Sequence, residues 1–461
     1  MALGRRKTER QLAFWIATED LPRSEGHVFY ENLNELLHQA GFDPLVETLC
    51  QPYYHNSQGR PGIPPGVYFR MLLVGYFEGI GSQRGIAWRC ADSLSLRQFL
   101  GIDLTEKTPD HSSLTRVRDR LPLEVHEAVF QFVLQVADEK GLFKGKTIAV
   151  DATTLEANAA MKNIVRRDTG EDWKEYVKRL MQEAGEIEEG DEPTAEEIAR
   201  FDRKRKDKKV SNRQWQSETD PDSRITKMKD GRTHLAYKAE HAVDLDTELI
   251  VAATVHHADQ SDADTIGHTV GEAQDNMIEA GIDSHIEEVV ADKGYHKNET
   301  LGDLEFTEGL RTYIAEPKYR HRRRWKGKPE EQRQAVSNNR RRNRGKRGRA
   351  LQRQRSEKVE RSFAHVCETG GSRRAWLRGI EKVRKRHLMS AAAHNLGVLM
   401  RMLYGFGTAR SFQAGGGLSA FLYSTLSATK RFLRRHFSST AISLLNSIAK
   451  WIKHGHPILS N

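Results

Sequence analysis

The pattern of hydrophobic and polar positions changes from helical to strand-like near residue 140. Before that point apolar residues recur at helical spacing. Segment 29–40 carries them three and four positions apart, and segment 67–80 follows two prolines, which suit a first helical turn. These patterns predict an all-helical N-terminal domain over residues 1–140.

The end of this helical region carries a cap motif followed by basic residues. Segment 108–113 combines Thr, Ser and Asp with an early proline, as at a helix start, and segment 114–121 holds three arginines. Short helices joined by tight turns, the last one basic, are compatible with a helix-turn-helix DNA reader. They are equally compatible with an ordinary helical bundle.

Downstream, two short apolar runs end abruptly in an aspartate, the first at Asp151 and the second at Asp292. Such runs predict strands buried on both faces of a sheet. The carboxyl ends of such strands are where open α/β sheets place their ligands. Each aspartate alone is typical of a residue that caps its own loop. Together they predict an oxygen-rich seat for a hard divalent cation.

The elements around these two strands predict a mixed sheet. We expect a hairpin of strands 233–243 and 248–255, a helix over 261–280, a helix over 299–308 and a strand over 312–315. This order is typical of an RNase H-like domain. The predicted fold class is therefore α/β, an RNase H-like mixed sheet with flanking helices, preceded by an all-α domain. We expect this RNase H-like domain to span 141–405, with a charged helical insertion over 161–225, of which residues 161 to about 209 show no sheet pattern.

Charge is concentrated in one segment. The chain carries a net charge of +10, yet residues 318–355 alone hold 17 Lys and Arg against 2 acids, so the remainder is mildly acidic. A block of this kind indicates a solvated segment or a contact with a polyanion such as nucleic acid. Residues 406–461 predict a helical C-terminal extension of unknown role.

Other features narrow the class of protein. No apolar run approaches the ~20 residues of a membrane span, and the N-terminus shows no signal peptide. The three cysteines lie far apart, which argues against a zinc site or a disulfide framework. We expect a cytoplasmic protein with no membrane partner.

A third acid is expected on a helix beyond the basic segment. Val359, Phe363 and Val366 recur at helical spacing, and Glu357 and Glu360 lie one turn apart, so either could face the aspartate pair. On such a basic helix a glutamate is also typical of a surface ion pair.

Three ordered blocks match a known family. IAVDATTLEAN, VVADKGY and RSEKVERSFAHVCETGGSRRAWLRG resemble the catalytic blocks of bacterial insertion-sequence transposases of the DDE type, which have an RNase H-like core. The stretch GRPGIPPGVYFRMLLVGYFEGIGSQRGIAWRC resembles the helical N-terminal domain of that group. The resemblance covers roughly residues 25–405.

The resemblance implies that Asp151, Asp292 and Glu360 are the catalytic acids and metal ligands, holding two Mg²⁺ ions for which Mn²⁺ can substitute. Glu360 is implied rather than Glu357, because the family's helix reads Arg, a short gap, Val-Glu-Arg and an aromatic. Where many relatives carry a lysine after the glutamate, this chain has Cys367.

Residues expected to contact nucleic acid come from the basic segment and from the catalytic blocks. They are Arg322, Arg323, Arg324, Arg340, Arg341, Arg342, Arg353, Arg361, Arg373, Arg374 and Tyr295. The last of these matches a tyrosine common after the second aspartate of the family.

The function implied is that of a DNA transposase in the bacterial cytoplasm, associated with the nucleoid. It would bind the ends of a mobile element, cleave them by metal-dependent phosphodiester hydrolysis and join them to target DNA. Its partners would be double-stranded DNA and further copies of itself, as a homodimer or larger assembly. Two alternatives stay open: an RNase H-like nuclease without strand transfer, and an inactive DNA-binding remnant.

Overall fold

The computed structural model describes most of the chain. The described residues are 17, 21, 26–55, 59, 62–206, 210–228, 231–318, 323 and 325–412. Arg322, Arg324 and the extension predicted beyond residue 412 lie outside this part of the chain.

The N-terminal region is helical, as its apolar spacing predicts. Its helices are α1 (Gly26–Gln39), α2 (Phe42–Cys50), α3 (Pro65–Phe77), α4 (Gln83–Ala91), α5 (Leu94–Leu100), α6 (His111–Arg120) and α7 (Leu123–Glu139), with a 3-10 turn η2 (Gln51–Tyr53). Cap residues fix where several of them begin: Ser82, Ser93 and Asp110 each accept a hydrogen bond from a backbone N–H of the first turn. The most buried of these helices is α3, whose Tyr68 and Phe69 have no exposed surface.

A six-stranded mixed sheet forms the centre of the second region. Its strands are β1 (Thr147–Glu156), β4 (Arg224–Lys227), β5 (Thr233–Asp244), β6 (Ile250–His257), β7 (Glu288–Ala291) and β8 (Arg311–Ile314). The order is β4-β5-β1-β7-β8, and β6 pairs with a further stretch of β5. Strand β1 runs antiparallel to β5 and parallel to β7, which is parallel to β8. The predicted mixed α/β class is confirmed.

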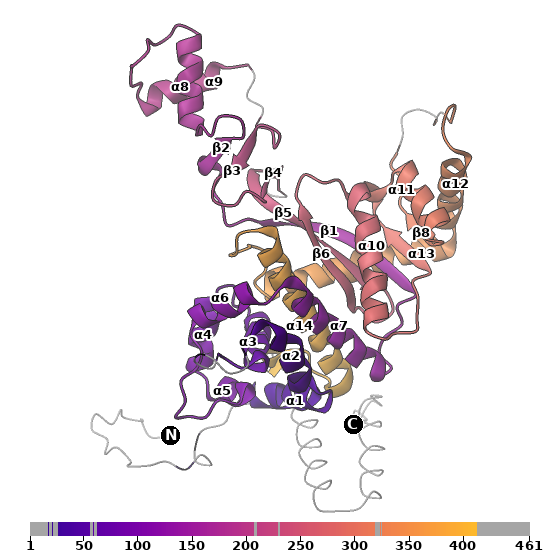
Figure 1. The fold of residues 1–461 in the computed structure, drawn as a ribbon. Coiled ribbons are helices and arrows are strands. Elements are labelled where there is room, and N and C mark those ends of the chain that lie inside the picture. The colour runs from indigo at the N-terminus through magenta and orange to yellow at the C-terminus, as the bar shows by residue number, and fades with distance from the viewer. Residues whose placement is uncertain are drawn as a thin grey trace, which may run out of the picture.

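Helices pack on both faces and at both ends of this sheet (Figure 1). They are α10 (Asp262–Glu279), α11 (Asn298–Gly302), α12 (Glu330–Arg344), α13 (Lys346–Phe363) and α14 (Ile380–Tyr404), with short turns η4 (Lys293–Tyr295), η5 (Asp303–Thr307), η6 (Ala364–Thr369) and η7 (Ala409–Phe412). Helix α14 packs against β6 on one side and against α3 and α7 on the other, so it joins the two regions. None of the helices in the described ranges combines the length and apolar character that a bilayer crossing requires.

The insertion between β1 and β4 differs from its prediction. It contains η3 (Met161–Asn163), β2 (Ile164–Arg166), α8 (Trp173–Glu183), α9 (Ala195–Lys204) and β3 (Trp215–Ser217). Strands β2 and β3 pair antiparallel, so the expectation of an arm without sheet structure was wrong. Three buried residues, Val177, Met181 and Ile198, give α8 and α9 a small core of their own. Both strands are only three residues long, too short for a period of two to be visible.

Two buried asparagines clamp strand ends onto helices. Asn395 of α14 accepts from the backbone N–H of Ile250 at 2.8 Å and donates to its carbonyl at 2.7 Å. Asn339 of α12 makes the same pair of bonds with Ile314, at 2.8 and 2.9 Å. Each amide thus satisfies backbone groups of β6 or β8 that would otherwise be buried without partners.

We expect Asn395→Leu to lower the free energy of unfolding by about 2–4 kcal/mol, because it leaves the N–H and C=O of Ile250 buried and unpaired. Thermal and urea unfolding of the purified chain would measure this. The control is Ser337→Ala on the exposed side of α12, which should be nearly neutral. Equal stability of Asn395→Leu and wild type would contradict the clamp.

Candidate active site

Two carboxylates occupy neighbouring positions where the pairing of β1 with β7 ends. The last pair in the parallel register is Val150 with Ala291, so Asp151 and Asp292 are the next residues on adjacent strands, which lie ~4.8 Å apart. Burial raises the pKa of Asp151 above its usual range. Arg355 lowers that pKa, whereas the charge of Asp292 raises it further. The register therefore produces the convergence that the two sequence runs predict.

The loop after Asp292 is held tightly. The carboxylate of Asp292 accepts from the backbone N–H of Gly294 at 2.7 Å and so begins turn η4. A Cβ added at Gly294 would lie 2.6 Å from a carboxylate oxygen of Asp262 and 3.0 Å from one of Asp292. A side chain at this position would therefore displace carboxylate oxygens, because the loop after Asp292 lies close to the start of α10.

A buried carboxylate on the neighbouring strand anchors this loop. Glu240 of β5 has no exposed surface and accepts from Thr265 and Thr269 of α10, both at 2.6 Å. Lys238 forms an ion pair with it at 2.9 Å, and the hydroxyl of Tyr295 donates to it at 3.2 Å. Four donors compensate the desolvation of this charge. Glu240 thereby ties the Asp292 loop and α10 to the sheet.

Tyr295 is therefore an internal residue. Its side chain is completely buried, and burial raises its pKa well above the usual value. The expected contact with nucleic acid is at odds with this placement, because the hydroxyl is already bonded to Glu240. What the tyrosine does instead is position the loop that carries Asp292.

Helix α13 lies across the same strand ends. The guanidinium of Arg355 donates to Asp151 at 2.6 Å, and the amide of Gln352 donates to the carbonyl of Ala291 at 3.0 Å. Further along, Ser362 lies 2.8 Å from a ring nitrogen of His241, the residue that pairs with Asp151 in the β1–β5 register. Sequence patterns do not single out Arg355 for this role, since it is one of many arginines in the basic segment.

Glu360 lies on α13, but its side chain does not converge with Asp151 and Asp292. It is exposed and follows Arg355 by five residues, which is about 7.5 Å along a helix axis. Within the described ranges, no three acidic, histidine or cysteine side chains converge closely enough to hold a metal ion. Glu357, the other glutamate considered for this position, is in an ion pair with Arg361.

The aspartate pair alone suits a hard cation chemically. Both side chains offer oxygen ligands, and a positive group, the Arg355 guanidinium, already contacts Asp151. A divalent ion would bind carboxylate oxygens of Asp151 and Asp292 and would reduce the repulsion between their two charges.

Many of the arginines expected on DNA pair with acids of the chain itself. Arg340 makes two bonds of 2.7 Å to Glu316, which also pairs with Arg323 at 3.5 Å. Arg342 pairs with Glu305 at 2.6 Å. These cations stabilise the end of the sheet around α11 and α12.

The arginines near α13 and its C-terminal turn are also engaged. Arg361 donates to Glu248 at 2.8 Å and contacts Glu357. Arg373 donates to Thr153 of β1 at 3.2 Å and contacts Glu368. Arg374 stacks over Trp376, with 5.0 Å between its guanidinium and the ring centre. Arg373 is thus the closest of them to Asp151 along β1.

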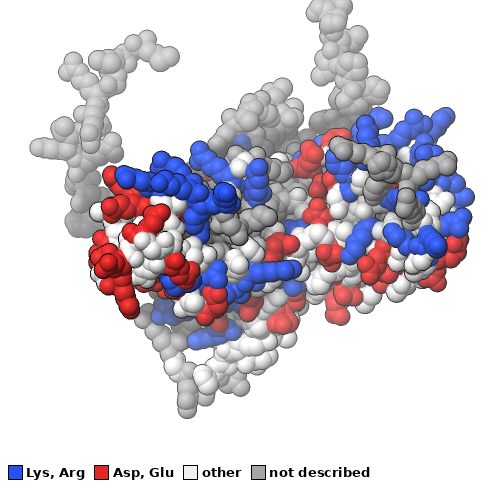
Figure 2. All heavy atoms as spheres, turned by 90° about the horizontal axis from the view of Figure 1, so that it is seen from above, with Lys and Arg blue, Asp and Glu red and all other residues white. Residues whose placement is uncertain are grey.

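A row of exposed cations runs along α13 towards Glu360. Lys346, Arg349 and Arg353 are spaced by three and four residues, which puts them on one side of the helix, and Glu360 continues that side seven residues later. Arg341 of α12 is exposed as well. Figure 2 shows Lys and Arg gathered at the right-hand end of the molecule, where Figure 1 places α12. We call Lys346, Arg349 and Arg353 the α13 row.

Two family models match parts of this arrangement. One, described as Transposase domain (DUF772), matches residues 18–120, and the other, described as Transposase DDE domain, matches residues 316–400. The second range contains Glu360, the α13 row and most of α14. Together the two matches support an insertion-sequence transposase of the DDE type. This family implies DNA as the substrate and, in general, a divalent metal for the chemistry.

Asp151 and Asp292 of the transposase lie outside both matched ranges, so their assignment depends on the sheet register and the sequence blocks. No curated protein and no solved structure matches the transposase.

The charge balance of the pair predicts how stability depends on pH. Because the folded pKa of Asp151 lies above its ordinary value of 3.8, the folded state binds the proton more tightly than the unfolded chain. The free energy of unfolding therefore falls as pH rises from the pKa of Asp151 in the unfolded chain to its higher pKa in the folded chain. Asp292→Asn removes one cause of the raised pKa, so we expect it to unfold a few °C higher than wild type at pH 7, with the difference shrinking towards pH 4.

Thermal unfolding without divalent ions, between pH 4 and 8, measures this effect. Asp283→Asn is the matched control: Asp283 is an exposed acid that precedes the start of β7, whereas Asp292 follows its end, and it should show no such trend. A variant Asp292→Asn that is less stable than wild type at every pH would contradict the repulsion between the two aspartates.

Proposed function

We propose that this transposase binds the ends of a mobile element, cleaves a phosphodiester bond there and joins the freed end to target DNA. The observation that carries the proposal is the adjacency of Asp151 and Asp292 where the parallel pairing of β1 with β7 ends, although β1 itself continues to Glu156. The strand order also supports an RNase H-like core, since β1 lies between an antiparallel β5 and a parallel β7. Handling two ends at once favours a homodimer or larger assembly.

In this proposal Asp151, Asp292 and Glu360 hold Mg²⁺, for which Mn²⁺ can substitute. When bound, such ions activate the attacking oxygen and stabilise the leaving oxygen of an in-line displacement at phosphorus. Glu360 contributes from α13 once its exposed carboxylate turns towards the pair. The first nucleophile is water, and the second is the 3′-hydroxyl of the element end.

The chain's own residues prepare this site. Arg355 balances the charge of Asp151 and would release it when a cation takes its place. The bond from Tyr295 to Glu240 keeps the Asp292 loop against the sheet, so that the carboxylate does not move away from Asp151. Cations of the α13 row, which lead towards Glu360, would hold DNA phosphates beside the acids.

The decisive experiment is cleavage of DNA that carries the gene's own flanking ends, in Mg²⁺ and in Mn²⁺. We expect wild type to nick at the ends and Asp292→Asn to lose at least a hundredfold in rate, because one ligand of the metal is gone. DNA binding is measured in parallel, so that lost cleavage is not mistaken for lost affinity.

Three outcomes separate the candidate functions. Nicking followed by joining to a second DNA supports transposition. Nicking that is never followed by joining supports the alternative of a nuclease without strand transfer. If wild type and Asp292→Asn both bind and neither cuts in either metal, the catalytic proposal is rejected and a DNA-binding remnant is the better description.

The α13 row gives a separate prediction. Replacing Lys346, Arg349 and Arg353 together with Gln should weaken DNA binding at every sequence. It should also lower the slope of log affinity against log salt by about 3, roughly one unit for each phosphate that is no longer neutralised. The matched control replaces three exposed lysines outside α12 and α13, namely Lys140, Lys144 and Lys174, with Gln. An unchanged salt slope in the triple variant would place the DNA elsewhere.

A further inference from the structure

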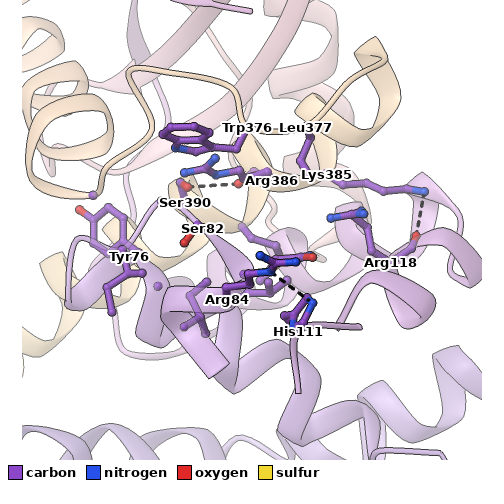
Figure 3. A pocket seen from close by; sticks show the side chains of 18 of the residues that line it. Tyr76, Ser82, Arg84, His111, Arg118, Trp376, Leu377, Lys385, Arg386 and Ser390 are labelled. Atoms are coloured by element: carbon purple, nitrogen blue, oxygen red, sulfur yellow. Dashed lines mark hydrogen bonds between the residues drawn. The ribbon is translucent and has the colours of Figure 1, made fainter. Parts of the chain in front are cut away.

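A cavity of about 300 Å³ lies where the N-terminal helices meet the segment after α13 (Figure 3). One wall comes from α3 and α4, with Tyr68, Leu72 and Ile86. The other comes from Trp376, Leu377 and the first turns of α14, with Met389. The cavity therefore joins two parts of the chain that are some 300 residues apart in sequence and that both belong to matched transposase domains.

An unpaired cation faces this cavity. Arg386 of α14 donates through one amino group to the carbonyl of Gly371 at 2.9 Å, while its other amino group is buried without a hydrogen-bond partner. No carboxylate of the described residues forms an ion pair with it. Burial lowers its pKa to about 10, so it stays charged at neutral pH. A buried charge without a counter-ion costs stability, and an anionic ligand would remove that cost.

Neighbouring cations reinforce the positive character. Arg118 of α6 is buried, and one of its amino groups also lacks a partner, although its other side contacts Asp119 at 3.4 Å. Lys385 is balanced by Glu381, and Arg84 lies exposed at the mouth beside His111. The cavity thus keeps an excess of positive charge directed at its interior, as the labelled side chains in Figure 3 show.

The remaining surface is apolar and includes an accessible aromatic ring. Trp376 is 47% exposed, which is unusual for a tryptophan in a folded chain. It approaches the N-terminal helices closely, since a Cβ at Gly81 would lie 2.7 Å from its ring nitrogen. An exposed ring in the same cavity as two guanidiniums that each have one buried amino group without a partner matches the two parts of a nucleotide, a planar base and a phosphate.

The cavity is connected to the aspartate pair through β1. The backbone N–H of Ala375 donates to the carbonyl of Glu156 at 2.8 Å, so the segment that carries Trp376 runs beside the end of β1. Glu156 follows Asp151 by five residues, about 17 Å along a strand. A DNA strand whose reacting phosphate lies at the pair could reach the cavity within a few nucleotides.

We propose that this cavity binds a single nucleotide, with the base against Trp376 and the phosphate on Arg386 and Arg118. The shared chemistry, a phosphate attached to a planar base, is found in a nucleotide of the DNA end and in a free nucleotide. If the nucleotide belongs to a DNA end, this proposal rests on the proposed function. If it is a free nucleotide, it does not, because binding at the cavity requires no cleavage.

The test measures the affinity of the full chain for three probes: DNA carrying the element end, dAMP and inorganic phosphate. Wild type is compared with Arg386→Gln, Trp376→Ala and Trp376→Phe, and with Lys140→Gln as the control for removal of one charge. We expect Arg386→Gln and Trp376→Ala to weaken nucleotide binding at least tenfold. Trp376→Phe should keep most of the affinity, because phenylalanine can still stack on a base.

The probes separate the possible results. Loss confined to element-end DNA identifies the DNA strand as the source, and loss confined to dAMP identifies a free nucleotide. The proposal is overturned if Arg386→Gln binds both as wild type does, or if inorganic phosphate binds as tightly as dAMP and Trp376→Ala changes nothing.

Folding of the variants is checked independently. Because Arg386 is an unpaired buried charge, Arg386→Gln should unfold at or above the wild-type temperature. A stable variant that loses nucleotide binding therefore reports on the cavity. Asp292→Asn is the last variant, and it should bind all three probes as wild type does. A loss of cleavage at the aspartate pair is thereby distinguished from a loss of nucleotide binding at the cavity.

Discussion

Like charges at neighbouring positions of two parallel strands repel each other, and much of this fold is arranged around that repulsion. The register of β1 with β7 leaves Asp151 and Asp292 no room to separate, since both follow directly on paired residues. The chain responds with a guanidinium from α13 on one carboxylate and a backbone N–H on the other. Helix α13 is consequently held by the charge it neutralises. A divalent cation would compete for the same oxygens, which couples occupation of the site to the position of the helix that carries Glu360.

Rigidity is concentrated beside the pair rather than at it. Glu240, fully buried with four donors, fixes α10 and the loop after β7, and the two asparagine clamps fix the ends of β6 and β8. All of these groups are satisfied, so they stabilise the scaffold. Two other sets of charges are less favourably placed. The charges of the two aspartates repel each other, and the guanidiniums of Arg386 and Arg118 each leave one buried amino group without a partner. A ligand of opposite charge would lower the cost of each.

The sequence predicted the sheet and the convergence of the two aspartates because buried strands have a simple pattern, an apolar run that ends in a polar residue. It did not predict that the basic segment folds into α12 and most of α13, since 17 Lys and Arg among its 38 residues hide the few apolar residues that face the sheet, such as Val336 and Leu351. The family's helix motif singles out Arg355, but no sequence pattern indicates its contact with Asp151. Tyr295 was expected on DNA because it matches a tyrosine common in the family, whereas its side chain is buried and its hydroxyl donates to Glu240.

Net charge is a poor guide to where this chain would meet a polyanion. Most of the described arginines of the basic segment that were expected on DNA are in ion pairs that hold the end of the sheet together, as Arg340 and Arg342 show. Among the residues that the structure describes, the cations without such partners include the exposed row on α13 and Arg386 at the cavity. Both are structurally connected to β1, one through Arg355 and the other through the segment that pairs with Glu156. A strand of DNA that follows unpaired positive charge would therefore pass the aspartate pair between them, and this path follows from pairing within the fold, which no count of lysines and arginines reveals.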